Sequence, residues 1–102
     1  MQNTTAVPIL SPVLAPGALR AEAELMAAEA APRRFAVCAM DYDESDAVVL
    51  AWGQAFRDGR VTLVGDAVPV RGTFSSVRSA LRVCRALGAP LHVAWVDPEP
   101  EG

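Results

Sequence analysis

The segment from residue 47 to residue 64 constrains the fold more than any other part of the sequence. Large and small side chains alternate over residues 47–56, AVVLAWGQAF, with the two-residue period of a β-strand. Asp58-Gly59 then gives the local signal of a hairpin turn, and residues 61–64, VTLV, return as a second strand. Because strands joined by so short a turn pair antiparallel, the sequence predicts an antiparallel sheet at the centre of the domain.

Two further segments extend this sheet. Residues 34–42, RFAVCAMDY, predict a strand that precedes the hairpin, and residues 43–46 predict an acidic turn between the two. Residues 67–71 predict a short fourth strand, which Pro69 confines to the edge of the sheet because proline lacks a backbone N–H.

A helix and a last strand complete the core. The helix is predicted over residues 75–87, with Thr73 or Ser75 as its N-cap and Gly88 just beyond its end. Its apolar residues recur at helical spacing and predict a buried stripe made of Val77, Ala80, Leu81, Cys84 and Leu87. Residues 91–96, LHVAWV, follow as the final strand.

An N-terminal helix precedes the sheet. Residues 18–31, ALRAEAELMAAEAA, are rich in strong helix formers, and Pro32 stops the helix. A weakly amphipathic helix of this length is marginal alone, so it needs a surface to pack against. We therefore assign four parts: an extended arm (1–17), an N-terminal helix (18–32), an α+β core domain (33–97) and an acidic tail (98–102).

The element order indicates an α+β fold with a mainly antiparallel sheet. The strands are apolar on both faces, so both faces need a cover. The helix over 75–87 covers one face, and we expect the N-terminal helix or a second subunit to cover the other. These expectations together favour a homodimer.

Composition excludes several classes of protein. A chain of 102 residues suits one domain, and 52% apolar residues with a net charge of -3 exclude a disordered charged tail or a strongly basic nucleic-acid coat. The N-terminus has no basic segment and no long apolar run, which favours a cytoplasmic protein without a membrane span. All nine basic residues are Arg and nineteen residues are Ala, which indicates a GC-rich bacterium. Cys38 and Cys84 match no metal spacing and are interpreted as reduced thiols at buried positions.

The first seventeen residues predict an extended arm. Proline recurs at every fourth position from Pro8 to Pro16, which prevents a helix. Apolar side chains lie between the prolines, and such an arm docks in a groove of a partner or of a sister subunit. The predicted contact residues are Val7, Ile9, Leu10, Val13 and Leu14.

Three arginines lie on one face of the helix predicted over residues 75–87. Arg78, Arg82 and Arg85 are spaced i, i+4 and i+7, opposite the apolar stripe. Residues 47–90 carry six Arg against two Asp, a local charge of +4. Such a stripe suits phosphate, nucleic acid or an acidic protein surface, and the alternative is an ordinary solvated helix face.

Other polar and aromatic residues have less specific interpretations. The acidic run Asp41, Asp43, Glu44 and Asp46 could bind a divalent metal through carboxylate oxygens, or could be a solvated turn between strands. His92 is the single histidine and is interpreted as a packing residue. The aromatic residues of the strands match a core, namely Phe35, Trp52, Phe56 and Trp95.

Residues 35–65, FAVCAMDYDESDAVVLAWGQAFRDGRVTLVG, resemble the opening of DnaQ-like exonuclease domains of the RNase H-like fold. There a first strand ends in an Asp-x-Glu pair, for which this chain has Asp-Tyr-Asp, and a strand hairpin follows. The later FSSVRSALRVCRALGAPLHVAWVDPE resembles the family's helix and its strand with the second acidic site. The resemblance implies a divalent metal held by Asp41, Asp43 and Asp97.

The leading hypothesis is a small non-enzymatic protein-interaction or regulatory module that self-associates and docks through its N-terminal arm, without a cofactor. The first alternative is nucleic-acid or phosphate binding through Arg78, Arg82 and Arg85 on a degenerate nuclease-like scaffold. The second is a metal-dependent phosphodiesterase that uses Asp41, Asp43 and Asp97.

Overall fold

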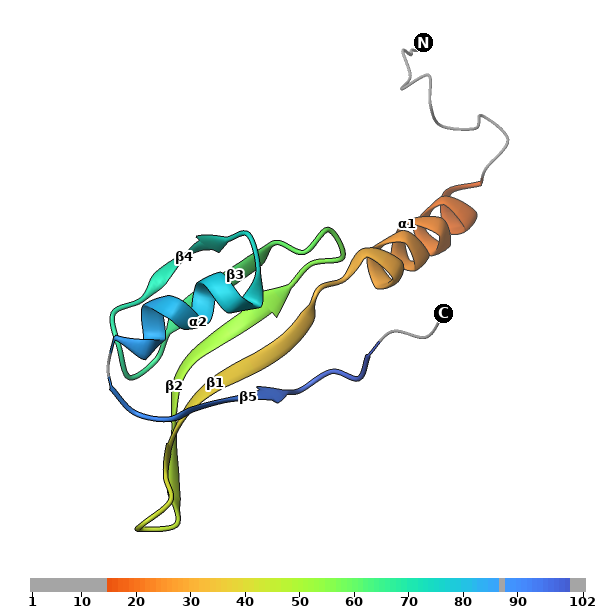
Figure 1. Cartoon of the computed structure of the whole chain (residues 1–102). Coiled ribbons are helices and arrows are strands. Elements are labelled where there is room, and N and C mark those ends of the chain that lie inside the picture. The colour runs from red at the N-terminus through yellow and green to blue at the C-terminus, as the bar shows by residue number, and fades with distance from the viewer. Residues whose placement is uncertain (1–14, 87, 100–102) are drawn as a thin grey trace. The chain divides into compact units, whose positions relative to one another are not determined.

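The computed structural model describes residues 15–86 and 88–99, and the chain divides into two compact units, residues 1–30 and 31–102. The described part of the first unit contains the helix α1 (Pro16–Ala30). The second contains five strands and one helix (Figure 1): β1 (Arg33–Asp41), β2 (Asp46–Ala55), β3 (Val61–Gly65), β4 (Arg71–Phe74), α2 (Val77–Arg85) and β5 (Leu91–Trp95).

Helix α1 begins two residues before the predicted start, at Pro16. Proline suits the first turn of a helix because the N–H it lacks would have no partner there. The helix ends at Ala30, before Pro32, whose ring disfavours helical backbone at the preceding residue. No residue of α1 is buried, and Leu25 and Met26 are 57% and 60% exposed.

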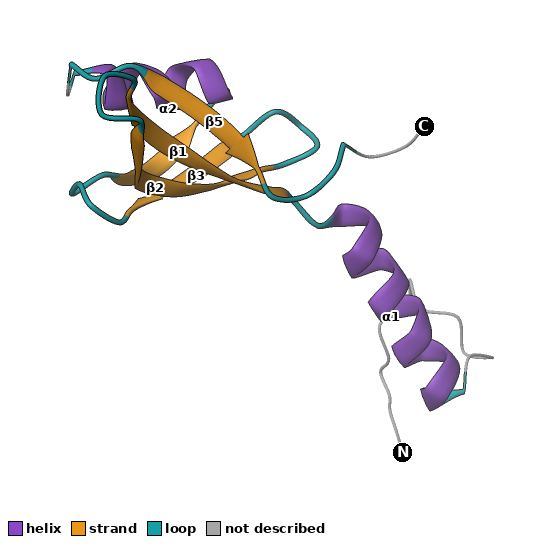
Figure 2. Ribbon diagram, turned by 90° about the horizontal axis from the view of Figure 1, so that it is seen from below, coloured by secondary structure: helices purple, strands orange, loops and turns teal. Residues whose placement is uncertain are grey.

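The five strands form one antiparallel sheet in the order β4-β3-β2-β1-β5, which confirms the α+β fold. Helix α2 connects β4 at one edge to β5 at the other and lies across one face of the sheet (Figure 2). The final strand therefore pairs with the first strand, and the hairpin of β1 and β2 occupies the centre.

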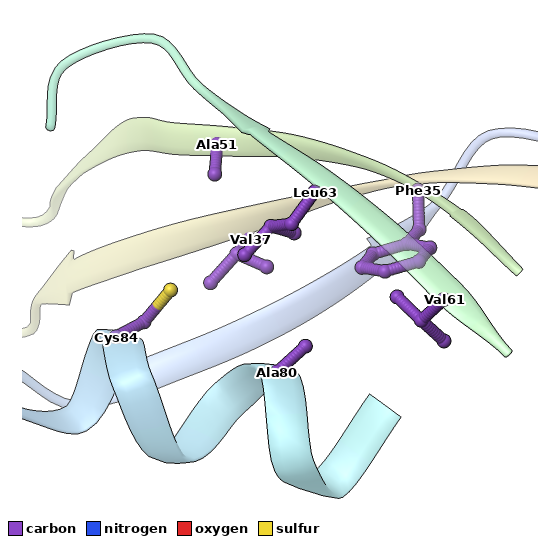
Figure 3. Close-up of a cluster of buried hydrophobic side chains, with 7 residues drawn as sticks. All are labelled: Phe35, Val37, Ala51, Val61, Leu63, Ala80 and Cys84. Atoms are coloured by element: carbon purple, nitrogen blue, oxygen red, sulfur yellow. The ribbon is translucent and has the colours of Figure 1, made fainter. Parts of the chain in front are cut away.

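The core lies between α2 and the sheet (Figure 3). Ala80 and Cys84 of α2 point toward the sheet and contribute to a cluster of buried side chains. The strands supply the other members: Phe35, Val37, Ala51, Val61 and Leu63. Four residues of the predicted stripe accordingly face the core, with Val77 and Leu81 packed at its margin, and the fifth, Leu87, lies outside the described residues.

The predicted strand over residues 67–71 is wrong, since β4 begins at Arg71. The N–H groups of Asp66 and Ala67 both donate to the Leu50 carbonyl, at 2.8 and 3.1 Å, so the chain turns immediately after β3. Val70 then donates to the Val68 carbonyl at 2.9 Å across Pro69. These bonds replace the ladder that a strand would need.

The predicted N-cap of α2 is also wrong. Ser76 caps the helix by accepting a hydrogen bond from the Ser79 N–H at 3.1 Å, and α2 starts at Val77. Thr73 cannot serve as a cap because it belongs to β4, where it pairs with Thr62.

The two tryptophans are not core residues, contrary to the interpretation of their pattern. Trp52 is 48% exposed and Trp95 is 41% exposed. Gly53 lies opposite Phe35, and a Cβ atom at Gly53 would collide with the Phe35 ring. The small residues of β2 therefore face α2, and Trp52 lies on the other face of the sheet.

The outer half of the hairpin of β1 and β2 projects beyond the sheet (Figure 1). The register shifts between Val37 and Cys38, which leaves Leu50 without a partner on β1. Beyond this bulge β5 still pairs with β1 as far as Ala39, and β1 and β2 then continue to the closing pair Asp41 and Asp46.

Candidate functional site

One face of the sheet, on the side opposite α2, carries apolar side chains that have no cover in the described part of residues 31–99. We call it the open face. Across the strands, Trp52 lies between Ala36 of β1 and Val64 of β3. Trp52 and Val64 are each 48% exposed, and Val96 just beyond β5 is 51% exposed. A half-exposed indole beside the exposed Val64, with the exposed Val96 on the same face, forms an apolar patch of the kind that marks docking surfaces.

The open face is hollowed beside Trp52. The hollow has a volume of about 550 Å³. Its walls come from three strands and the end of β5: Arg34, Trp52, Gly53, Gln54, Thr62, Val64 and Val96. Because the hollow lies on the face opposite α2, helix α2 does not cover its opening.

Several polar groups at the hollow already have partners. Thr62 Oγ1 donates to Gln54 Oε1 at 3.2 Å. Arg34 donates from Nε to Asp97 Oδ2 at 2.9 Å and from Nη2 to Asp97 Oδ1 at 2.7 Å. A partner that covered the hollow would therefore bury the Arg34 charge together with its counterion and the Thr62 hydroxyl together with its acceptor, which lowers the cost of burial.

The chain beyond β5 is fastened to the start of β1. Arg33 stacks on Trp95, with the guanidinium carbon 4.0 Å from the ring centre, and its Nε donates to the Pro98 carbonyl at 3.1 Å. The side-chain and backbone hydrogen bonds from Arg34 lower the pKa of Asp97 to about 2. Asp97 thus serves as the anion of a structural ion pair at the rim of the hollow.

The three carboxylates of the metal hypothesis are not brought together. Asp41 and Asp43 lie at the tip of the hairpin, whereas Asp97 lies beside Arg34 at the other end of β1. The seven residue steps from Arg34 to Asp41 span roughly 23 Å of strand. In residues 15–86 and 88–99, no group of three or more His, Cys, Asp or Glu side chains could hold a metal ion.

The acidic run forms the turn of the hairpin. Asp41 Oδ1 accepts a hydrogen bond from the Glu44 N–H at 3.1 Å, and Asp46 Oδ1 accepts one from the Ala47 N–H at 2.8 Å. Ser45 has a φ of 53°, the left-handed conformation of a tight turn. A groove of about 500 Å³ lies between this turn and the segment before β5.

The arginine stripe is placed as its spacing predicts. Arg78, Arg82 and Arg85 are all exposed on the side of α2 that faces away from Ala80 and Cys84. Among the described residues, none of the three forms an ion pair within 4.0 Å. The stripe therefore presents three guanidinium groups to solvent that no carboxylate of residues 15–86 or 88–99 pairs with.

The remaining predicted residues have simpler placements. His92 is exposed on β5, where it is the partner of Cys38. The arm residues Val7, Ile9, Leu10, Val13 and Leu14 lie outside the described residues. The arm itself was assigned as far as residue 17, but Pro16 and Gly17 belong to α1.

Comparisons of this chain with protein-family models, curated proteins and solved structures found no match. The resemblance to DnaQ-like exonuclease domains consequently rests on the residues of this sequence alone. Among the described helices, neither is long and apolar enough to cross a bilayer.

Sequence reasoning missed the open face as the site. The signal was present in the alternation of β2, where Trp52 shares a face with Leu50 while Ala51, Gly53 and Ala55 share the other. Small residues on one face let a helix or an aromatic ring approach that face closely. The face with Trp52 could then have been recognised as the one that the helix leaves open.

Proposed function

We propose that this chain is a small non-enzymatic protein-interaction module that self-associates and uses the open face as a docking surface. The supporting observation is the position of Trp52, which is half exposed beside a hollow of about 550 Å³ on the face opposite α2. Tryptophan residues in such positions contribute disproportionately to binding energy at protein interfaces.

The proposed occupant is the N-terminal arm, residues 1–14, of a sister subunit. This segment has no charged side chain, so it can cover an apolar surface without burying a charge. Proline fixes the backbone angle φ, so a segment that contains prolines loses less conformational entropy when it docks. The anchors are the apolar residues predicted from the sequence: Val7, Ile9, Leu10, Val13 and Leu14.

The reach of the arm is compatible with a neighbouring subunit. Fourteen extended residues span at most about 46–50 Å, longer than any single strand of the sheet. Arm exchange between two copies would cover the open face of each copy with the arm of the other. This arrangement is closed and symmetric, as in most homo-oligomers.

Fluorine NMR on protein labelled with 5-fluorotryptophan tests the docking. The chain has two tryptophans, so Trp52 and Trp95 give two resonances, which the variant Trp52→Phe assigns. Deletion of residues 1–14 is expected to shift the Trp52 resonance and to leave that of Trp95 in place. Dilution of the full chain is expected to move Trp52 in the same direction, because the arm comes from another molecule. Unchanged resonances in both experiments would refute the docking site.

A second candidate function is polyanion binding by the arginine stripe. It is supported by the exposure of Arg78, Arg82 and Arg85 and by their lack of ion pairs among the described residues. Binding of single- and double-stranded nucleic acid at low salt is then expected to weaken steeply as salt rises. Arg82→Ala should weaken binding, whereas Arg57→Ala, which removes the same charge from an exposed turn, should leave it nearly unchanged. No binding at low salt would rule this function out.

A further inference from the structure

The outer edge of β5 presents unpaired backbone groups. Val96 donates its N–H to the Arg34 carbonyl at 2.9 Å, and the Pro90 carbonyl accepts from the Met40 N–H at 2.8 Å. Alternate residues of an antiparallel strand direct their backbone groups to the same neighbour. Residues 92 and 94 therefore face β1, while the N–H and C=O groups of Leu91, Val93 and Trp95 point to the outer side. In the described part of the chain no strand lies beyond β5.

The two edges of the sheet differ in how they resist pairing. Edge strands of monomeric proteins are protected by shortness, by charged residues and by proline. The other edge, β4, has four residues, begins with Arg71 and follows Pro69. By contrast, β5 has five residues, LHVAW, without a formal charge or a proline, and Pro90 stands directly before it. Because Arg33 and Arg34 hold residues 97 and 98 against β1, the end of the described chain is drawn away from the outer edge.

We propose that the outer edge of β5 is the self-association surface, and that it pairs antiparallel with β5 of a second copy about a two-fold axis at Val93. This inference rests on the proposed self-association and specifies its surface. Val93 lies opposite Val93 of the partner subunit, and Leu91 lies opposite Trp95 of the partner subunit. In each of these pairs both residues direct their N–H and C=O groups across the axis, so every free edge group obtains a partner.

The side chains of β5 suit this register. Trp95 is the partner of Phe35 on the core side of the sheet, and the two ring centres are 5.0 Å apart. Leu91, Val93 and Trp95 share this side, since alternate residues of a strand do. The 41% of Trp95 that is exposed would thus contact the partner's Leu91, giving an aromatic–aliphatic cross-strand pair on each side of the axis.

The edge pairing also unites the two open faces. A sheet that continues through β5 into the second copy places both open faces on the same side. Each hollow then lies on the side of its sheet that is nearer to the two-fold axis, because Arg34 and Val96 at its rim adjoin β5.

Hydrogen exchange of the full chain, measured at high and at low protein concentration, tests the pairing. At high concentration the amides of residues 91, 93 and 95 are expected to exchange on the order of tenfold or more slowly than after dilution below the dissociation constant. The amides of residues 92 and 94 face β1 and serve as the internal control, with rates that depend little on concentration. The proposal would be overturned if residues 91, 93 and 95 exchanged at equal rates at both concentrations while the measured mass changed from dimer to monomer. A chain that stayed monomeric at high concentration would also overturn it.

A charge-swap pair gives a second test. In the proposed register, residue 92 lies opposite residue 94 of the partner subunit. A double variant with His92→Glu and Ala94→Glu therefore places like charges face to face across the axis. A second double variant, with His92→Lys and Ala94→Lys, does the same with positive charges. Each variant is expected to be monomeric by light scattering, and an equimolar mixture is expected to form the heterodimer. Thr73→Glu, on β4, is the matched edge control and should remain dimeric. Dimeric charge variants would overturn the proposal.

The two proposals can fail separately. Deletion of residues 1–14 tests the arm through the resonance of Trp52, whereas the exchange pattern of β5 reports the edge. If the Trp52 resonance depended on concentration but the exchange rates of residues 91, 93 and 95 did not, docking of the arm would be supported and the pairing of β5 would be rejected.

Discussion

Arg34 and Asp97, which are 63 residues apart in the chain, form a three-point contact at the rim of the open face. The backbone N–H of Arg34 donates to Asp97 Oδ2 at 2.8 Å, and its guanidinium binds both carboxylate oxygens at 2.9 and 2.7 Å. The contact fixes the exit of β5 against the start of β1. It therefore links the orientation of the edge strand to one wall of the hollow.

Asp97→Asn is expected to lower Tm at neutral pH, because the neutral amide cannot replace the bidentate ion pair. The folded protein lowers the pKa of Asp97 from 3.8 to about 2, so the stabilisation is complete above pH 3.8 and is lost as the pH falls through 2. Thermal unfolding followed by circular dichroism from pH 7 to pH 2 measures this. The difference in Tm between wild type and variant should shrink below pH 4, and a constant difference would contradict the assignment.

Gly53→Ala is expected to destabilise the domain by about 2 kcal/mol, because the added methyl group would collide with the Phe35 ring. Gly72→Ala is the matched control, since a Cβ atom there would lie 3.5 Å from the Phe74 ring, an ordinary contact. The control should change the free energy of unfolding by less than about 0.5 kcal/mol. Urea unfolding of both variants measures the difference, and similar stabilities would show that Gly53 is not needed for the position of Phe35.

Ser76→Ala is expected to cost about 1 kcal/mol, because it removes the side chain that accepts from the Ser79 N–H at the first turn of α2. Ser75→Ala removes a neighbouring hydroxyl that lies 3.3 Å from the Ser79 hydroxyl. It should be nearly neutral. If chemical unfolding found Ser75→Ala to be the more damaging change, the assignment of the cap would be reversed.

The two thiols are expected to differ in reactivity. Cys84 is buried among the core residues and burial raises its pKa, whereas Cys38 is partly exposed on β1. Burial and the raised pKa both lower the fraction of Cys84 that is present as an accessible thiolate, and the thiolate is the reactive form. At pH 8 a maleimide or iodoacetamide reagent should modify Cys38 faster by an order of magnitude or more, and denaturant should equalise the rates. Mass spectrometry of peptides resolves the two sites.

The order of the elements was predictable because local patterns carry it. Alternation over residues 47–56 and the Asp58-Gly59 turn specify β2, the hairpin and β3 without reference to distant residues. The segment over residues 67–71 was not predictable in the same way. Its turn depends on hydrogen bonds to Leu50, a residue of another strand at a bulge.

The candidate site was predictable only in part because its parts are distant in the sequence. A two-residue period states that Trp52 and Leu50 share a face, but the fit of Phe35 over Gly53 decides which face α2 covers. The position of Asp97 was also not predictable, because it depends on a residue far away in the sequence. A carboxylate that resembled a metal ligand in the sequence is instead paired with Arg34, because β5 returns beside β1 and antiparallel to it.

The central claim is that the arm of one copy occupies the open face of another. A synthetic peptide with the sequence of residues 1–14 can be added to nitrogen-labelled protein that lacks those residues, and the chemical shifts of the backbone amides can be followed. The account predicts saturable shifts concentrated around the hollow, at Trp52, Gln54, Thr62, Val64 and Val96. Shifts that centre on the hairpin turn at residues 41–46, or no shifts at millimolar peptide, would contradict it.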